Sequence, residues 1–388
     1  MSVIPAAGIG AAGAMAETQM GGSAPIFRSE TQTGPPGGAG GGVAAAPRGL
    51  WYLAMPGMRL RRGTAVHRTL LDEPVLIGRD KAGKVFAMRD ICPHRAMPLS
   101  AGRFDGETVT CAYHGWQFGT DGVCRAIPSL VEDTAKNIRL DRIGVKSYPC
   151  REVQHLVWVY FGDDAGSGDE GLPPIPEMPV RGRPGIAETL ELECHFDDAV
   201  IGLIDPAHGA YVHRTWLWRS SKTLKEKAKR YAPSDLGFTM VRHTPSDNSR
   251  IIRLLRGQKT VEIGFRLPGV RVEHMTLGDR HYYVGLTAMT PIAEYRTAMH
   301  HVMYWSHPLM TLAKPLVVPA TRNFLNQDRT AMNLQREGRK KSDAAMLLPD
   351  ADTPAKWYLA LKKELAASRA EGRDFRNPVT ETVLRWRS

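Results

Sequence analysis

Apolar residues in the first part of the chain recur at the spacing of short β-strands. Between Thr64 and Met88, short apolar runs alternate with polar residues and are broken by glycine and by charged pairs (residues 80–84), which predicts a β-hairpin. Asp121-Gly122 predicts a further hairpin turn, and residues 155–162 predict a closing strand. Residues 50–162 are therefore expected to form a small antiparallel β domain.

The second part of the chain, from about residue 186, also reads mainly as strands. A predicted strand over 187–192 is followed by strand-like runs at 237–243, 251–256, 260–267, 270–276, 281–290 and 298–305, joined by short turns. So many consecutive strands predict an antiparallel sheet. The basic stretch from Lys222 to Arg230 is interpreted as a solvated helix or loop.

Helical spacing returns near the C-terminus. Over residues 320–338, offsets of three and four predict a helix with one face formed by Phe324, Asp328, Ala331 and Gln335. A last helix is predicted to begin at 352–354, where a capping residue precedes proline in the first turn. Its apolar stripe is interpreted as core packing and consists of Trp357, Tyr358, Leu361 and Leu365.

Composition divides the 388 residues further. Residues 1–47 are rich in Gly, Ala and Pro and cannot bury enough apolar surface to order themselves, so a disordered tail is predicted. Residues 163–185 are rich in Gly, Pro and acidic residues and predict a linker. The expected organisation is a first domain over 48–162 and a second over 186–388, with an overall α+β fold class.

The formal charge of +11 indicates either a solvated basic surface or an acidic partner. No basic stripe interleaved with aromatic residues argues for nucleic acid. No apolar run reaches the roughly 18–20 residues of a membrane helix, and the N-terminus lacks the basic start of a signal peptide. Two of the five cysteines lie in the motifs described next; the remaining three, an odd number without framework spacing, predict free thiols in a reducing compartment, and the protein is expected to be cytoplasmic.

Two short motifs carry the chemistry of the first domain. Cys92-Pro93-His94-Arg95 reads Cys-x-His, and residues 111–118 (Cys-Ala-Tyr-His-Gly-Trp-Gln-Phe) read Cys-x-x-His. Two thiolates and two imidazoles in this order suit a [2Fe–2S] cluster with two Cys on one iron and two His on the other. A Cys2His2 zinc site is the alternative, although zinc fingers usually pair Cys with Cys and His with His along the chain.

Together with their flanking residues, these motifs resemble the Rieske domain of Rieske non-haem iron oxygenases. The resemblance covers about residues 50–340 and implies an N-terminal antiparallel β Rieske domain followed by a catalytic domain with a twisted antiparallel sheet flanked by helices. It implies Cys92, His94, Cys111 and His114 as cluster ligands. Respiratory Rieske proteins carry an extra cysteine in each cluster loop, whereas this chain has Ala96, Met97 and Tyr113 there.

A second histidine pair follows, in the pattern Asp205-x-x-His208-x-x-x-x-His213. Two histidines five apart occur often, so unrelated histidines on a partly buried helix are the alternative. After a Rieske domain, the spacing resembles the segment that binds mononuclear Fe(II). Residues five apart diverge on a regular helix, so we expect a helix through about His208 and a break at Gly209.

The resemblance also implies a carboxylate ligand from a later helix. Asn326-Gln327-Asp328-Arg329 is similar to the segment that carries it, so Asp328 is the predicted ligand, with the rivals Asp343, Asp350 and Asp352 in a polar stretch. The resemblance implies that Asp205 carries electrons by bridging His208 to a cluster histidine of a neighbouring subunit; a helix-capping role is the alternative. Many relatives have Asn at the position of Gly202, so the match is looser there.

The resemblance implies the oxygenase component of a multi-component system with two cofactors, a [2Fe–2S] cluster and Fe(II). A separate reductase or acidic ferredoxin would bring electrons from NAD(P)H, and the chains would form a homotrimer. Hydroxylation, demethylation or desaturation of an organic, apolar substrate with O2 is expected, with Trp216, Trp218 and Tyr282-Tyr283 as pocket candidates. The alternative is an electron-transfer Rieske protein without mononuclear iron.

Overall fold

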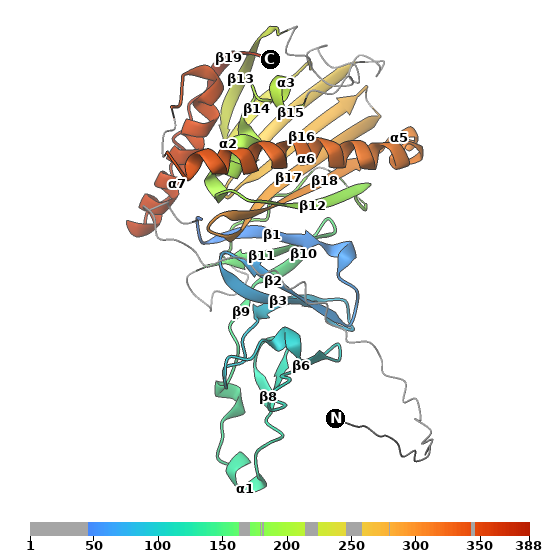
Figure 1. Cartoon of the computed structure of the whole chain (residues 1–388), viewed down its shortest axis with the longest axis vertical. Helices are drawn as coiled ribbons and strands as arrows, with labels where there is room; N and C mark the ends of the chain where they lie inside the picture. The colour runs from blue at the N-terminus through green and yellow to red at the C-terminus, as the bar shows by residue number, and fades with distance from the viewer. Residues whose placement is uncertain are drawn as a thin grey trace, which may run out of the picture.

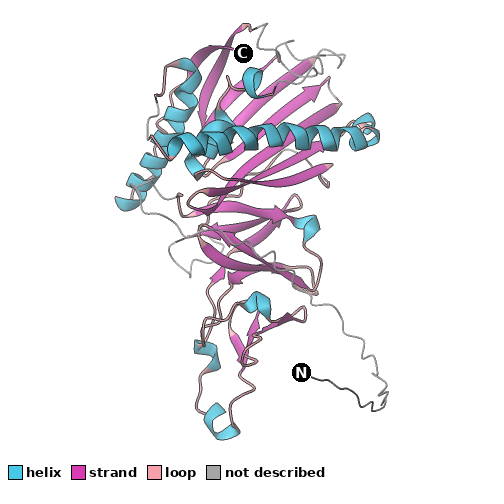
Figure 2. Cartoon of the chain, viewed as in Figure 1, coloured by secondary structure: helices cyan, strands magenta, loops and turns pink. Residues whose placement is uncertain are grey.

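The structure is a computed structural model of the chain, and it describes residues 46–162, 171–178, 180, 182–213, 224–245, 258–278, 280–342 and 346–388. Residues 1–45 of the expected tail, residues 163–170 of the expected linker, and the run 251–256 lie outside the described residues, as do Trp216, Trp218 and the rival ligand Asp343. Mostly antiparallel sheets with a few helices confirm the α+β fold class (Figures 1 and 2). None of the helices in these ranges combines the length and hydropathy of a membrane span.

The N-terminal region consists of three small antiparallel sheets. Their orders are β1-β11-β10, β2-β3-β4-β9 and β5-β6-β7-β8. The strands are β1 (Leu50–Pro56), β2 (Thr64–Leu70), β3 (Glu73–Arg79), β4 (Val85–Arg89), β5 (Arg103–Phe104), β6 (Thr108–Thr110), β7 (Gln117–Gly119), β8 (Cys124–Ala126), β9 (Ser147–Tyr148), β10 (Cys150–Val153) and β11 (Leu156–Phe161), with a short helix α1 (Glu132–Ala135).

The hairpin predicted over residues 64–88 is present as β2, β3 and β4. The sequence did not indicate the turn between β2 and β3, because Leu71 and Asp72 adopt positive φ angles of 53° and 59° without glycine. The closing strand is shorter than predicted: His155 (φ 63°) belongs to the turn before β11. Gly122, with a φ of 85°, lies between β7 and β8 as expected for a hairpin turn.

A single eight-stranded antiparallel sheet dominates the C-terminal region, in the order β12-β18-β17-β16-β15-β14-β13-β19. Its strands are β12 (Ile186–Leu192), β13 (Glu226–Ser234), β14 (Gly237–His243), β15 (Lys259–Arg266), β16 (Val270–Leu277), β17 (His281–Ala293), β18 (Arg296–Trp305) and β19 (Thr382–Arg387). The helices are α2 (Phe196–Ile204), α3 (Gly209–Val212), α5 (Pro308–Leu312), α6 (Lys314–Arg339) and α7 (Thr353–Ala370).

The described part of the basic stretch contradicts the sequence interpretation. It is strand β13, paired on one side with β14 and on the other with the C-terminal strand β19. Lys227 is buried in this strand and donates a hydrogen bond of 2.6 Å to Ser388 Oγ. The interpretation was wrong because a strand can alternate charged and apolar positions, and because its partner β19 lies about 150 residues further along the chain.

The two faces of the large sheet bury different partners. Val284, Leu286 and Val302 on one face share a core with Trp51 and Trp158 of the N-terminal region. The other face packs against helices: Phe196 and Val200 of α2 and the apolar stripe of α7 share a core with Met289, Met299 and Phe265. The stripe predicted for α7 is therefore core packing. In Figure 1, α6 crosses this helix-covered face.

Strand β1 joins the N-terminal region to the sheet. All seven of its residues are buried, which is expected for a strand covered on both faces. Tyr52 lies in the core shared with α2, whereas Trp51 and Leu53 lie in the core beneath β17. Thr290 Oγ1 also donates a 2.7 Å hydrogen bond to the carbonyl oxygen of Leu53. The two regions therefore share their hydrophobic cores.

Candidate metal centres

The first centre lies at the end of the molecule farthest from the large sheet, next to β6 and β8 (Figure 1). Two loops of nearly equal construction carry its residues. In the first, the amide of Cys92 donates to the carbonyl of Met97, and the amide of Ala96 donates to the carbonyl of Cys92. In the second, the amide of Cys111 donates to the carbonyl of Trp116, and the amide of Gly115 donates to the carbonyl of Cys111.

The residue four positions after each cysteine turns the loop through the left-handed region. Ala96 has a φ of 55° and Gly115 a φ of 70°. Glycine adopts this conformation freely, whereas alanine does so at a cost of roughly 1–2 kcal/mol. Each loop carries one thiol and one imidazole.

The thiols and the imidazoles lie in different environments. Cys92 and Cys111 are buried, at 2 % and 3 % exposure, whereas His94 is exposed and His114 half-buried. Burial raises the pKa of Cys92, and the neighbouring Cys111 raises it further, so cluster assembly must displace thiol protons. The rings of His94 and His114 lie 4.6 Å apart. A sulfur pair inside and a nitrogen pair outside match the two irons of a Rieske cluster.

Residues that flank the motifs support the loops. The Trp116 ring stacks on His94 at 4.7 Å with an interplanar angle of 6°, and Phe118 is fully buried in the core below. Asp90 also supports the first loop, a role that no sequence motif indicates. This buried carboxylate accepts hydrogen bonds from the Ser100 amide and hydroxyl and lies 2.6 Å from His67 Nδ1, so it ties the start of the first loop to its end.

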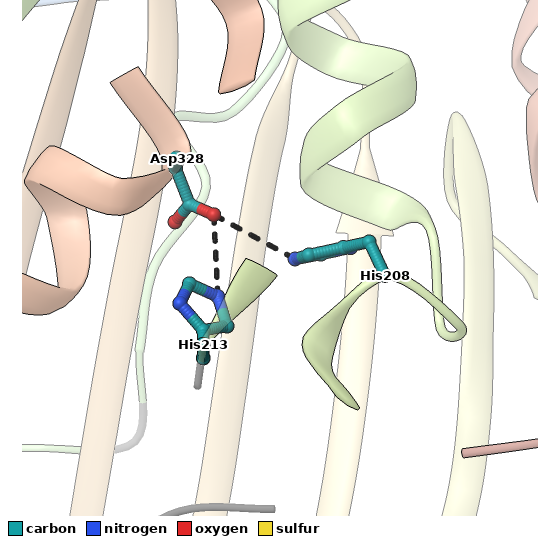
Figure 3. Close-up of side chains that lie close together, drawn as sticks. All are labelled: His208, His213 and Asp328. Carbon is teal, nitrogen blue, oxygen red and sulfur yellow. Dashed lines mark ion pairs between the residues drawn. The ribbon is translucent and has the colours of Figure 1, made fainter. Parts of the chain in front are cut away.

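The second centre lies between α3 and α6, on the helix-covered side of the sheet. One donor atom each from His208, His213 and Asp328 lies within 4.8 Å of the other two (Figure 3). His213 Nε2 lies 3.2 Å and His208 Nε2 3.7 Å from the same oxygen, Asp328 Oδ1. Among the described residues this is the one group of three donors so close together, and the Cys and His of the cluster loops do not form such a group.

The backbone that presents the two histidines differs from the expectation. Helix α2 ends at Ile204, and Asp205 is extended (ψ 119°) because the following Pro206 disfavours a helical residue before it. His208 caps the short helix α3, and Gly209 begins that helix instead of breaking it. The main break therefore falls at Asp205-Pro206, before His208. The helix between the two histidines is only four residues long, and His213 itself leaves helical backbone (ψ 67°). The ring centroids lie 5.4 Å apart.

His213 is held for a ligand role in three ways. Its side chain is 2 % exposed, its ring stacks on Phe324 at 3.6 Å, and its Nδ1 lies 3.1 Å from Gln327 Oε1. An amide oxygen can only accept, so Nδ1 carries the proton and Nε2 is left with a lone pair. Nε2 is buried without a hydrogen-bond partner. A buried nitrogen of this kind, facing a carboxylate, fits a metal ion.

His208 is oriented by Asp205. Its Nδ1 donates to the carbonyl oxygen of Asp205 at 3.0 Å and lies 3.6 Å from Oδ2 of the same residue. Burial lowers the pKa of His208, but the Asp205 and Asp328 carboxylates outweigh it, so the pKa is raised. Asp205 Oδ1 also accepts from the amide of Ala207, which closes a turn around Pro206. Asp205 does not cap the start of a helix, because α3 begins at Gly209 with His208 as its N-cap residue.

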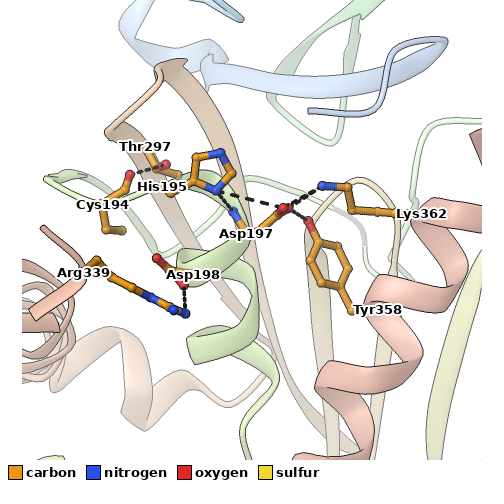
Figure 4. A network of polar contacts seen from close by, with 8 residues as sticks. All are labelled: Cys194, His195, Asp197, Asp198, Thr297, Arg339, Tyr358 and Lys362. Carbon is orange, nitrogen blue, oxygen red and sulfur yellow. Dashed lines mark hydrogen bonds and ion pairs between the residues drawn. The ribbon is translucent and has the colours of Figure 1, made fainter. Parts of the chain in front are cut away.

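The start of α2 is fixed by a network of ion pairs and hydrogen bonds (Figure 4). Lys362 Nζ lies 2.6 Å and 2.8 Å from the two oxygens of Asp197, and Tyr358 donates to the same carboxylate. Arg339 pairs with Asp198 at 2.9 Å. Acidic residues in the first turn also complement the helix dipole. Helices α6 and α7 therefore hold α2, and with it the segment that carries His208.

Two further positions explain differences from the sequence-based picture. A Cβ at Gly202 would lie 3.0 Å from Met332, so Met332 fills the space that a side chain at residue 202 would occupy. The predicted face of α6 is only partly correct: Phe324 and Asp328 face the histidines, whereas Gln335 is exposed. The helix also begins at Lys314, earlier than predicted.

Comparison with known proteins agrees with this picture. The family model for the Rieske [2Fe-2S] domain matches residues 50–149. Toluene-4-sulfonate monooxygenase iron-sulfur subunit from Comamonas testosteroni is 35 % identical over 179 residues (45 % of this chain, 48 % of that protein). 4beta-Methylsterol monooxygenase from Methylococcus capsulatus is 33 % identical over 166 residues (42 % and 44 %). The matched part thus spans about half the length of these curated relatives.

The fold is similar beyond the Rieske domain. Dicamba monooxygenase, solved with non-heme iron and dicamba, superposes with a TM-score of 0.65 at 19 % identity, covering 85 % of this chain and 100 % of that structure. Residues 50–149 are thus a Rieske [2Fe–2S] domain. The chain is a homologue of the oxygenase components of Rieske oxygenases and has their fold.

Proposed function

We propose that this chain is the oxygenase component of a multi-component Rieske system, with Fe(II) held by His208, His213 and Asp328 and a cluster held by Cys92, His94, Cys111 and His114. The observation that carries the proposal is the buried, unpartnered Nε2 of His213, which faces Asp328 beside His208. Two neutral imidazoles and one carboxylate are the ligand set of non-haem Fe(II) oxygenases.

Fe(II) bound by such a set supplies oxidation of a substrate C–H bond by O2. The residues of this chain would prepare the site for it. Gln327 keeps the proton of His213 on Nδ1, and Asp205 keeps that of His208 on the corresponding nitrogen, so both Nε2 atoms stay available. Phe324 covers one face of the His213 ring and limits access of water to it.

We expect electrons to enter at the exposed edge of His94 and to reach the iron of a neighbouring chain. In Figure 1 the cluster loops and α6 lie toward opposite ends of one chain, so a homotrimer in which Asp205 bridges His208 to a neighbour's cluster histidine would shorten the path. The charge of +11 suits an acidic ferredoxin or reductase that draws on NAD(P)H. None of the five cysteines forms a disulfide, and beside the two proposed cluster ligands this leaves three free thiols, as expected for a reducing compartment such as the cytoplasm.

A single-turnover experiment tests the proposal without the unknown electron donor. Protein reduced chemically in the absence of oxygen is mixed with isotopically labelled O2 and a panel of apolar compounds, and products are analysed by mass spectrometry. Products that are hydroxylated, demethylated or desaturated by the wild type and absent with Asp328→Ala support an oxygenase. A coloured protein that contains only cluster iron would instead be an electron carrier.

A further inference from the structure

A glycine lies in the middle of the longest strand of the large sheet. Gly285 is the fifth of the 13 residues of β17, and its pairing with β16 and β18 is regular. Glycine weakens a strand interior and usually marks a bulge, a tight bend or the close approach of a ligand or backbone. Neither a bulge nor a tight bend is present at Gly285, where the pairing on both sides is regular.

Packing does not require a glycine either. A Cβ at residue 285 would meet the Tyr283 hydroxyl at 3.5 Å and His301 Cε1 at 3.9 Å, both ordinary contacts. By comparison, a Cβ at Gly237 in β14 would lie 1.9 Å from a carbonyl oxygen, so the backbone there demands glycine. Gly285 therefore leaves a space that a side chain could occupy.

Polar side chains surround this space on the same face of the sheet. Glu273 lies directly opposite Gly285, and Arg271, Thr287 and His301 form the adjacent cross-strand row. Thr287 Oγ1 lies 2.8 Å from His301 Nδ1, and Arg271 pairs with Glu273 at 3.0 Å. Together with Tyr283, these residues form what we call the Gly285 cradle.

The cradle faces the mononuclear site. Met303 lies opposite Gly285 on β18 and accepts a hydrogen bond from Thr321 of α6. Asp328 is seven residues, or about two turns, farther along α6 on the same side as Thr321. The charge of Asp328 also acts on His301, whose pKa is lowered to about 4 by burial and by Arg271 despite that carboxylate. His301 is therefore neutral near pH 7.

The charges of the cradle select the group that fits. Arg271 has five N–H donors, and one of them bonds Glu273. A carboxylate in the cradle would lie beside Glu273 and be repelled, because that residue already neutralises Arg271. A hydroxyl group can accept from a remaining Arg271 N–H and donate to Glu273 or Tyr283. The Arg271–Glu273 pair is thus suited to a neutral group that both donates and accepts hydrogen bonds.

We propose that the Gly285 cradle binds a hydroxyl group of the substrate, an otherwise apolar alcohol, and so orients its skeleton beneath the mononuclear iron. This inference rests on the proposed function, since it assigns the substrate end of the same site. Phe265 precedes Arg271 in the cross-strand row, and Met303 lies beside Gly285, so apolar surface flanks the cradle for the remainder of the molecule.

The test uses three probes with one skeleton: naphthylmethanol, naphthoate and methylnaphthalene. Their binding to iron-loaded protein is measured by calorimetry without oxygen. We expect the alcohol to bind at least about tenfold more tightly than the other two, because a cradle built for a hydroxyl leaves its polar groups unpaired with the methyl analogue. Gly285→Val should remove this preference by filling the space.

Gly264→Val is the matched control, since a Cβ at Gly264 meets only Thr239 Oγ1 at 3.6 Å and lies on the opposite face of the sheet. If Gly285→Val fails to fold, Gly285→Ala and Glu273→Gln replace it. Tighter binding of naphthoate, no saturable binding of the alcohol, or unchanged binding in the folded Gly285 variant would overturn the cradle. Iron content of the same samples is read separately, so loss of mononuclear iron contradicts the proposed function and not the alcohol site.

Discussion

The two groups of histidines in this chain are held in different ways. His94 and His114 lie near the surface on two loops, each closed by its own backbone hydrogen bonds within six residues. His208 and His213 lie on either end of a four-residue helix and need Asp328, Gln327 and Phe324 from α6 to complete their surroundings. The first site is thus built locally and the second by tertiary packing.

This difference decides what a mutation can do. A change in a cluster loop is expected to act on the two loops, which contact each other through Trp116 and His94, whereas the mononuclear site can be altered from α2, α3 or α6. His300 provides a comparison: its Nε2 is also buried without a hydrogen-bond partner, yet among the described residues it belongs to no group of three converging donors. An unpartnered nitrogen indicates a metal site only where other ligands converge on it.

The largest effect is expected at the residue proposed to connect the two sites. Asp205→Asn should leave both metal centres occupied but lower turnover about 100-fold. This is the upper end of the loss seen when residues that orient metal ligands are mutated. Rapid-mixing spectroscopy would follow reoxidation of the cluster. Asp235→Asn, at a turn between β13 and β14, is the control. Normal turnover in Asp205→Asn would contradict the bridging role.

Acid should destabilise the sheet through its buried histidines. Burial lowers the pKa of His300 to about 3, below the ordinary value of the unfolded chain, so the unfolded state takes up the proton first as pH falls. This contribution is complete above about pH 6.5 and should shrink by about 2 kcal/mol between pH 7 and pH 5.

Urea unfolding of wild type and His300→Gln at these two pH values measures the difference. The glutamine can still bond Thr189, which lies 3.0 Å from His300 Nδ1. The variant should lose less stability on acidification than the wild type, with His301 accounting for part of what remains. Equal losses in both proteins would show that His300 is not the titrating group.

A smaller effect is expected from the residue that orients His213. Gln327→Leu frees Nδ1 and should weaken mononuclear iron binding about tenfold, with no change in the visible spectrum of the cluster. Gln335→Leu is a matched control, because Gln335 is exposed on the same helix. Equal iron affinity in the two variants would mean that Gln327 does not orient the ligand.

The smallest effect is expected from the paired loop positions. Gly115→Ala places alanine in the left-handed region and should destabilise the second loop by about 1 kcal/mol, while Ala96→Gly should relieve the corresponding cost in the first. The temperature at which the visible absorbance of the cluster is lost measures the effect of both substitutions. A cluster equally stable in all three proteins would show that loop strain does not limit it.

The same contrast explains what could be predicted from the sequence. The cluster loops were readable because each places its donors within three residues, and the spacing of His208 and His213 stood out after them. Asp328 was found through a resembling segment, since nothing local links it to residues 115 positions earlier. Phe324 and Gln327 were placed beside Asp328 by the helical spacing and by the resembling segment, but their contacts with His213, like the role of Asp90, depend on packing across the fold and could not be predicted.

Local structure was predicted wrongly where a neighbouring residue or a distant strand determined it. Pro206 ends α2 early, although glycine was expected to make the break. Strand β13 was missed because its basic residues resemble a solvated surface until β19 pairs with it. The role proposed for Gly285 could not be predicted either, since it depends on the strands on either side. The proposed domain boundaries at 48–162 and 186–388 remain a prediction.

The most direct test of the account is the iron content and visible spectrum of protein purified without oxygen, compared with a His208→Ala/His213→Ala double variant. The account predicts a red-brown protein with about three irons per chain, and about two in the variant with an unchanged cluster spectrum. A coloured protein with about two irons in both forms would contradict the mononuclear site.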